Sequence, residues 1–220
     1  MLGPPEPMLL DTCVVQNIEW VWDRMEENMT WTEERVSELE AQFGVPFANE
    51  LLDLGYLVDH LQYEGFPWLV SASARQEFEQ HAGSKRPGLL KGWRRLQEHQ
   101  EDWAVESFRG VAASVLVPSP NVRINPLVLR GLGVASVHDI VADDGPLAGF
   151  PDRGDRALIC DGLLSGVPAI LTTDLRTFWS RRQLLYEFGL EVWRPSDALT
   201  AYIPKWKFER EDRARRFPSS

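Results

Sequence analysis

The sequence has no apolar run that approaches the ~20 residues a membrane-spanning helix requires. Its first seven residues also lack the basic start and the long apolar core of a secretory signal. We therefore expect no association with a membrane and a location in the cytoplasm. Residues 1–7 are expected to form a flexible leader before the fold begins at Met8.

Cysteine and histidine are scarce, with two of the first and four of the second. Cys13 and Cys160 lie in apolar segments without metal-binding spacing, which predicts two reduced core residues. The histidines show no ligand spacing, and neither GxxxxGK[ST] nor HExxH occurs. The segment 131–136 lacks the third glycine of a dinucleotide-binding turn. These absences argue against zinc enzymes and P-loop nucleotide-binding proteins.

Basic residues are outnumbered, and the formal net charge is −10. The excess is local, because residues 1–66 hold 14 acidic and 2 basic side chains. Residues 67–127 hold 6 acidic and 8 basic side chains, and residues 204–220 hold 3 and 6. The distribution of charge matters more than its sum, so the acidic total does not exclude a polyanionic substrate.

Short apolar runs alternate with amphipathic segments along most of the chain. Strands are predicted at residues 8–15, continuing into a loop or helix start, and at 68–71, 169–172 and 191–193. Helices are predicted at 17–29, from an N-cap at Thr30 onward, and at 47–63, 72–81, 89 to about 108, 127–132, 155–165 and 175–188. Residues 137–141 fit a short helix or a turn. This alternation predicts an α/β fold with a mostly parallel sheet.

Two of the apolar runs end in an aspartate. Asp11 follows Met8–Leu10, and Asp174 follows the run that begins at Ala169. Because open α/β sheets bind ligands beyond the carboxyl ends of their strands, both side chains are expected at one edge. Glu77 and Asp155 lie in neighbouring helical segments. The four carboxylates are therefore predicted to converge on one divalent cation.

A cluster of four carboxylates suits a hard cation. Mg²⁺ and Mn²⁺ prefer carboxylate, phosphate and water oxygens, and Mg²⁺ takes one or two protein carboxylates directly. Without a cation the acids would repel one another, and some would stay protonated. Taken singly, each acid has an ordinary structural alternative. A strand-end aspartate often caps a turn, Asp155 fits a helix N-cap, and Glu77 fits a solvated helix face.

Several stretches of the chain resemble the PIN-domain family of metal-dependent ribonucleases. In chain order they are Leu9–Thr12, Ser71–Phe78, Asp155–Ile159, Ile170–Asp174 with Phe178, and Val192–Pro195. The resemblance implies a three-layer α/β/α sandwich with a mostly parallel central sheet over residues 8–203. Residues 20–66 and 83–150 would be helical insertions, and residues 204–220 a basic tail.

The resemblance also implies a chemistry, namely endonucleolytic hydrolysis of RNA that leaves 5′-phosphate and 3′-hydroxyl ends. It assigns Asp11, Glu77, Asp155 and Asp174 as the catalytic acids that bind Mg²⁺ or Mn²⁺. Contacts to substrate are expected from Thr12, Thr172, Arg176, Arg181 and Arg182, since arginines hold the phosphate backbone. Relatives are often toxins paired with an antitoxin protein, and often homodimers, so both partners are expectations here.

The chain departs from the family pattern just after Asp174. Many family members carry a further carboxylate there, whereas this chain continues with Leu175, Arg176 and Thr177. One metal is therefore the safer prediction, with Asp152 and Asp161 as candidates for a second site.

Two other functions stay open on the sequence. One is a catalytically inactive PIN-like scaffold that binds RNA or protein. The other is a phosphatase with a strand-end aspartate as nucleophile. Such phosphatases usually carry a second aspartate two residues later, where this chain has Cys13.

Overall fold

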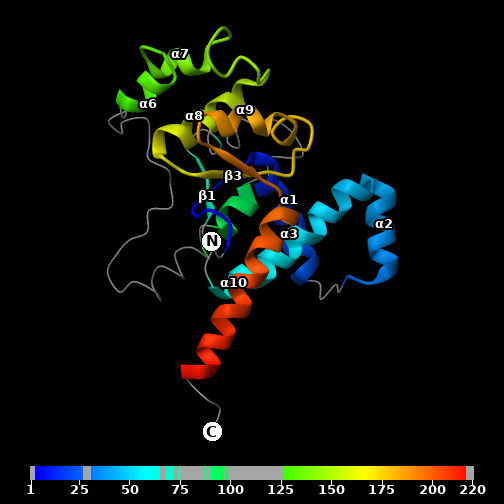
Figure 1. Ribbon diagram of the computed structural model, residues 1–220. Helices are drawn as coiled ribbons and strands as arrows, with labels where there is room; N and C mark the ends of the chain where they lie inside the picture. Colours follow the sequence, from blue (N-terminus) through cyan, green and yellow to red (C-terminus); the bar gives the residue numbers. More distant parts are fainter. Residues whose placement is uncertain are drawn as a thin grey trace.

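A four-stranded parallel sheet lies at the centre of the protein (Figure 1). The computed structural model describes residues 3–26, 31–64, 68–71, 74, 87, 90–96, 98 and 126–216. The strands are β1 (Met8–Leu10), β2 (Trp68–Leu69), β3 (Ala169–Leu171) and β4 (Glu191–Trp193), in the order β2-β1-β3-β4. All three pairings are parallel. The mixed α/β class with a parallel sheet is therefore confirmed.

The two central strands, β1 and β3, are short and completely apolar. All six of their side chains are buried, as expected for parallel strands covered on both faces. Their register pairs Leu10 with Leu171, so the two strands end side by side. The residues that follow each strand, Asp11 and Thr172, therefore lie at the same edge of the sheet.

The helices form two groups around this sheet (Figure 1). One group consists of α1 (Thr12–Glu26), α2 (Glu33–Phe43), α3 (Val45–Glu64) and α10 (Pro195–Arg216). The other contains α7 (Val137–Val141) packed on α8 (Arg153–Ser165), with α9 (Arg182–Glu187) against β4. None of the described helices is long and apolar enough to cross a membrane.

The first helix begins earlier than expected, at Thr12 rather than at residue 17. The carbonyl of Asp11 accepts hydrogen bonds from the amides of Val14 and Val15, so Asp11 occupies the N-cap position. Val14, Ile18 and Val21 then fall on the buried face of the helix. The early start also corrects the prediction for Cys13, which is exposed instead of lying in the core.

A single glycine joins α2 to α3. The N-cap of α2 is Thr32, not Thr30, and its side chain accepts a hydrogen bond from the amide of Arg35. Gly44 has a φ of 80°, which favours glycine, and its amide donates to the carbonyl of Glu40. The chain therefore turns sharply at Gly44 and starts α3 at Val45, two residues before the predicted start.

The middle of the chain is described in part. Most of the predicted helix at 72–81 and most of the one from residue 89 to about 108 lie outside the described residues, although residue 74 and residues 90–96 are helical. The helix α6 (Pro126–Gly131) confirms the short helix expected near residue 127. Residues 137–141 form a helix, α7, with Ser136 and Asp139 in a reciprocal capping box.

The segment after β3 differs from the expected single helix over 175–188. A series of turns leads to a short 3₁₀ helix, η1 (Trp179–Arg181), and then to α9. The reason lies in Asp174, whose Oδ1 accepts hydrogen bonds from the amides of Arg176 and Thr177 at 2.8 and 3.0 Å. An aspartate that bonds nearby amides in this way stabilises a turn in competition with a helix.

The last helix, α10, continues through residue 204 to Arg216 and so includes most of the segment expected as a basic tail. Residues 3–7, expected as a flexible leader, contact this helix. Lys205 Nζ donates to Glu6 Oε1 at 3.0 Å, and Pro4 is buried. The N-terminal residues therefore pack on the middle of α10, and the end of this helix projects away from the rest of the protein (Figure 1).

Candidate functional site

The carboxylate of Asp11 lies at the carboxyl end of β1 and is almost completely buried, with 3% exposure. Thr172 Oγ1 donates a hydrogen bond to Asp11 Oδ2 at 2.7 Å. The backbone amides of Thr12 and Cys13 also donate to this side chain, so it caps α1. Asp11 is therefore a helix cap, as the structural alternative predicted. The same hydrogen bonds hold its carboxylate in one orientation.

Burial raises the pKa of Asp11 from 3.8 to about 6. That pKa already includes the opposing effect of the hydrogen bonds from Thr172 and from the first turn of α1, and a smaller upward effect from the negative charge of Asp174. A carboxyl group with this pKa changes its charge close to neutral pH. A positive charge placed beside it would favour the ionised form.

Thr172 links the two strand-end aspartates. Its hydroxyl donates to Asp11 and accepts a hydrogen bond from the amide of Asp174 at 2.9 Å. Its own amide donates to the carbonyl of Trp193 at the end of β4, and its side chain is buried. Three neighbouring strand ends therefore fix the geometry of this pair, as expected for the carboxyl edge of a parallel sheet.

Asp174 lines a pocket of about 580 Å³, named here the carboxylate pocket. Its lining residues come from α1, from the corner between α2 and α3, and from the segment after β3: Cys13, Gln16, Asn17, Phe43, Pro46, Phe47, Thr173, Asp174, Leu175 and Arg176. Asn17 Nδ2 donates to Thr173 Oγ1 at 2.9 Å, which joins two of these walls. Among these lining residues Asp174 is the one carboxylate and Arg176 the one cation.

The other predicted acids are distributed unevenly. Asp155 is half-buried in the first turn of α8. A short connection joins the end of α8 to β3, so the helix runs antiparallel to the strands. The first turn of α8, which contains Asp155, therefore lies toward the carboxyl edge of the sheet. Asp152 is the exposed N-cap of α8, and its Oδ1 accepts from the amide of Gly154. Asp161 lies about 9 Å further along the helix than Asp155. Glu77 lies outside the described residues.

The three predicted arginines fall in different surroundings. Arg176 is exposed and shares the carboxylate pocket with Asp174. The guanidinium of Arg181 bonds the carbonyls of Arg176 and Thr177 and contacts the ring of Phe150. Arg182 bonds the carbonyl of Trp179 and lines a different pocket. Of the three, only Arg176 is placed to meet an anion beside Asp174.

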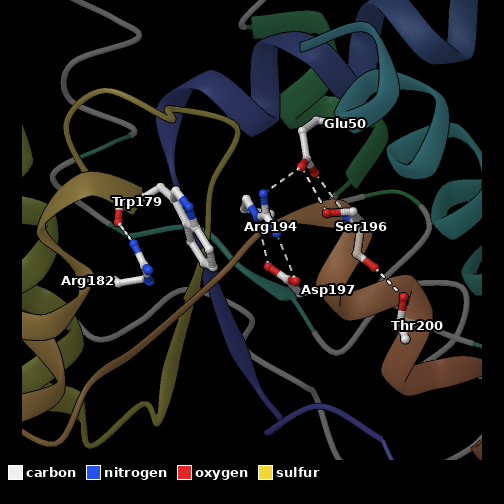
Figure 2. Close-up of polar contacts among 7 residues, drawn as sticks. All are labelled: Glu50, Trp179, Arg182, Arg194, Ser196, Asp197 and Thr200. Carbon is white, nitrogen blue, oxygen red and sulfur yellow. Dashed lines mark hydrogen bonds and ion pairs between the residues drawn. The ribbon is translucent and has the colours of Figure 1, made fainter. Parts of the chain in front are cut away.

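The second pocket has a volume of about 630 Å³ and lies beside β4. It is lined by Trp179, Arg182, Gln183, Tyr186, Glu191, Val192, Trp193, Asp197, Thr200 and Ala201. Figure 2 shows the ring of Trp179 between two guanidinium groups, those of Arg182 and Arg194, at 4.2 and 4.1 Å. Both faces of this indole are therefore covered within the protein.

Arg194 belongs to a network that joins three elements (Figure 2). It makes two hydrogen bonds to Asp197, at 2.8 and 3.0 Å, and an ion pair with the buried Glu50 of α3 at 3.5 Å. Glu50 also accepts hydrogen bonds from the amide and the hydroxyl of Ser196. These groups satisfy one another, so the network fixes α10 against α3 and β4.

Asp11 and Asp174 are the described residues at this edge that could hold a hydrated divalent cation. Mg²⁺ takes only one or two protein carboxylates directly and keeps several waters. Within the described part of the chain, no three Asp, Glu, His or Cys side chains come together to hold a metal ion. The described donors therefore suit one hydrated ion and do not form a complete protein cage.

Several pocket residues were not predicted from the sequence. Cys13 and Asn17 lie one helical turn apart on α1, and this face becomes visible only once the helix is started at Thr12. Phe43 and Phe47 are on either side of Gly44, in a segment expected only to be a helical insertion. These residues are uncharged and lie far from Asp174 in the sequence, so nothing in the sequence indicated that they line the same pocket.

No protein-family model, curated protein or solved structure significantly matches the chain.

Proposed function

We propose that this protein is a metal-dependent endoribonuclease similar to PIN-domain enzymes, and that the carboxylate pocket is its active site. The observation that carries the proposal is the Asp11–Thr172–Asp174 arrangement at the carboxyl ends of adjacent central strands. Two acids held in one place at a sheet edge, beside a pocket with an exposed arginine, suit hydrolysis of a phosphodiester.

A bound Mg²⁺ or Mn²⁺ would supply an activated water and neutralise charge on the phosphate. Asp11 and Asp174 would hold that ion, and Thr172 keeps the Asp11 carboxylate in one orientation through its hydroxyl. Arg176, at the mouth of the same pocket, would neutralise a phosphate oxygen of the RNA backbone. The raised pKa of Asp11 means that the ion and a proton compete for the same carboxylate.

The test is incubation of labelled RNA with the protein and Mn²⁺. Wild type is compared with Asp11→Asn and Asp174→Asn, which remove the charges, and with Glu77→Gln. Asp144→Asn is the matched control, because Asp144 is exposed and lies outside the pocket. We expect cleavage by wild type and by the control, with losses of about 100-fold or more in Asp11→Asn and Asp174→Asn. Equal cleavage by all five proteins would refute the proposal.

A non-catalytic scaffold is the second candidate, and one observation favours it. Asp11 is already used as the cap of α1, and the described acids form no group of three. A titration with Mn²⁺ separates the two proposals, because a ligand that binds the folded state raises its melting temperature. A nuclease should be stabilised by Mn²⁺ and lose this effect in Asp174→Asn, whereas a scaffold should show no Mn²⁺-dependent stabilisation in either protein.

A further inference from the structure

One part of the lining of the carboxylate pocket is apolar and mostly aromatic. It is formed by Phe43, Pro46 and Phe47 at the corner where α2 meets α3. Phe43 is 40% exposed, so part of its side chain is in contact with solvent. We call Phe43 and Phe47 the aromatic corner.

The aromatic corner is held by its own small hydrophobic cluster. Leu39, Ala48 and Leu51 are buried there, and partly buried rings pack on them, among them Trp20, Trp31 and Phe47. Phe43 packs edge-on against Trp20, with ring centroids 6.3 Å apart, and its ring is tilted against Phe47 at 5.8 Å. Because Phe43 lines the pocket and is 40% exposed, part of its side chain remains open to the pocket.

We propose that the aromatic corner is a stacking wall for one unpaired nucleobase of the substrate RNA. The base would lie on Phe43 while the adjoining phosphate meets Asp174, its bound cation and Arg176 on the other wall. The inference rests on the proposed function and adds a structural requirement to it. The nucleotide next to the cleaved bond has to be unstacked and unpaired.

The chemistry of the pocket selects this occupant over an apolar peptide. A volume of about 580 Å³ is in the range of small-molecule sites and accommodates a single nucleotide. One wall offers π surface and the other offers charged and amide groups from Asp174, Arg176 and Asn17. A nucleotide matches both walls, since its base has a π face and its phosphate carries charge.

The experiment measures binding and not cleavage. The probes are a short fluorescent single-stranded RNA and an oligomer of the same length that has the ribose-phosphate backbone but no bases. Each probe is titrated once in EDTA and once with Ca²⁺, which would occupy the proposed cation site. The proteins are wild type, Phe43→Leu, Phe43→Tyr and the control Phe208→Leu, since Phe208 is an exposed phenylalanine of α10 outside the pocket.

We expect Phe43→Leu to weaken binding of the RNA by about 5- to 100-fold, the usual range for one base–aromatic stack. Its binding of the base-free oligomer should not change, because leucine keeps the apolar packing and loses only the π face. Phe43→Tyr should restore RNA binding, and Phe208→Leu should bind both probes as wild type does.

An equal loss for both probes, or no loss in Phe43→Leu, overturns the inference. If wild type cleaves RNA in Mn²⁺ while Phe43→Leu binds RNA normally, only the stacking wall fails and the proposed function stands. If wild type neither binds nor cleaves RNA, both fail together.

Discussion

Thr172 Oγ1 donates to Asp11 Oδ2 at 2.7 Å, across 161 positions of sequence, and this bond joins the ends of the two central strands. The donor hydroxyl is buried, so it has no water to exchange with. The hydroxyl orients the carboxylate of Asp11, and the burial of that carboxylate disfavours its ionised form. The bond therefore couples the charge state of Asp11 to the packing of the sheet edge.

The first prediction concerns the pH dependence of stability. The folded pKa of Asp11, about 6, lies above the value of 3.8 for an unfolded chain, so the folded state binds the proton more tightly. The contribution of this group to stability is therefore fully present below pH 4 and is lost as the pH rises through 6. The loss amounts to about 3 kcal/mol by pH 7.5.

The isosteric variant Asp11→Asn isolates this effect, since asparagine keeps an oxygen acceptor for Thr172 and cannot ionise. Urea denaturation in EDTA should show Asp11→Asn more stable than wild type at pH 7.5, with the difference shrinking toward zero at pH 4. A difference that does not change with pH would mean that Asp11 ionises freely in the folded protein.

Much of the fold could be predicted from the sequence, because the buried strands have a distinctive amino-acid composition. The runs at Met8–Leu10 and Ala169–Leu171 are short, apolar and followed by aspartates, which is the pattern of buried parallel strands. The same pattern placed Asp11 and Asp174 at one edge of the sheet. Local periodicity was therefore sufficient for the sheet and for this pair of carboxylates.

The two wrong helix boundaries have one cause. A side chain that bonds nearby backbone amides changes where a helix starts or ends, and the spacing of apolar residues does not show such bonds. Asp174 turns the chain where the apolar spacing predicted a helix from 175. Asp11 starts α1 five residues early, which moved Cys13 from the predicted core to the surface. The aromatic corner depends on a long-range contact between Phe43 and Trp20, and spacing cannot show such contacts.

The second prediction concerns Glu50, the buried acid of the Arg194 network (Figure 2). Glu50→Ala removes the ion pair to Arg194 and both acceptors of Ser196, leaving a backbone amide at the start of α10 without its partner. The amide of Ser196 is half-buried, and the loss of its acceptor together with the loss of the ion pair to Arg194 costs about 2–4 kcal/mol.

Urea denaturation of Glu50→Ala measures this cost against Glu38→Ala, an exposed glutamate on α2 that should change stability by less than about 0.5 kcal/mol. Equal midpoints for the two variants would show that the network contributes nothing to stability.

The third prediction compares two glycines with room for a side chain. A methyl group added at Gly166 or at Gly131 meets no atom within 4 Å, so neither substitution to alanine causes a clash. Gly166 ends α8 with a φ of 67°, whereas Gly131 ends α6 without a positive φ. We expect Gly166→Ala to lose about 1 kcal/mol or more and Gly131→Ala to lose nothing or gain slightly. Thermal melts of both variants decide this, and a Gly166→Ala protein as stable as wild type would contradict it.

The fourth prediction separates the two cysteines, neither of which is in a disulfide. Cys13 is exposed and lines the carboxylate pocket, whereas burial, with the charge of Asp161, raises the pKa of Cys160 to about 12. Because the thiolate is the reactive form, a maleimide should label Cys13 in the native protein and Cys160 only after denaturation. Mass spectrometry counts the adducts, and Cys13→Ser should remove the native one. Since Cys13 lines the same pocket as Asp174, single-stranded RNA bound there should slow the labelling of wild type. Labelling at the same rate with and without RNA would place the RNA outside this pocket.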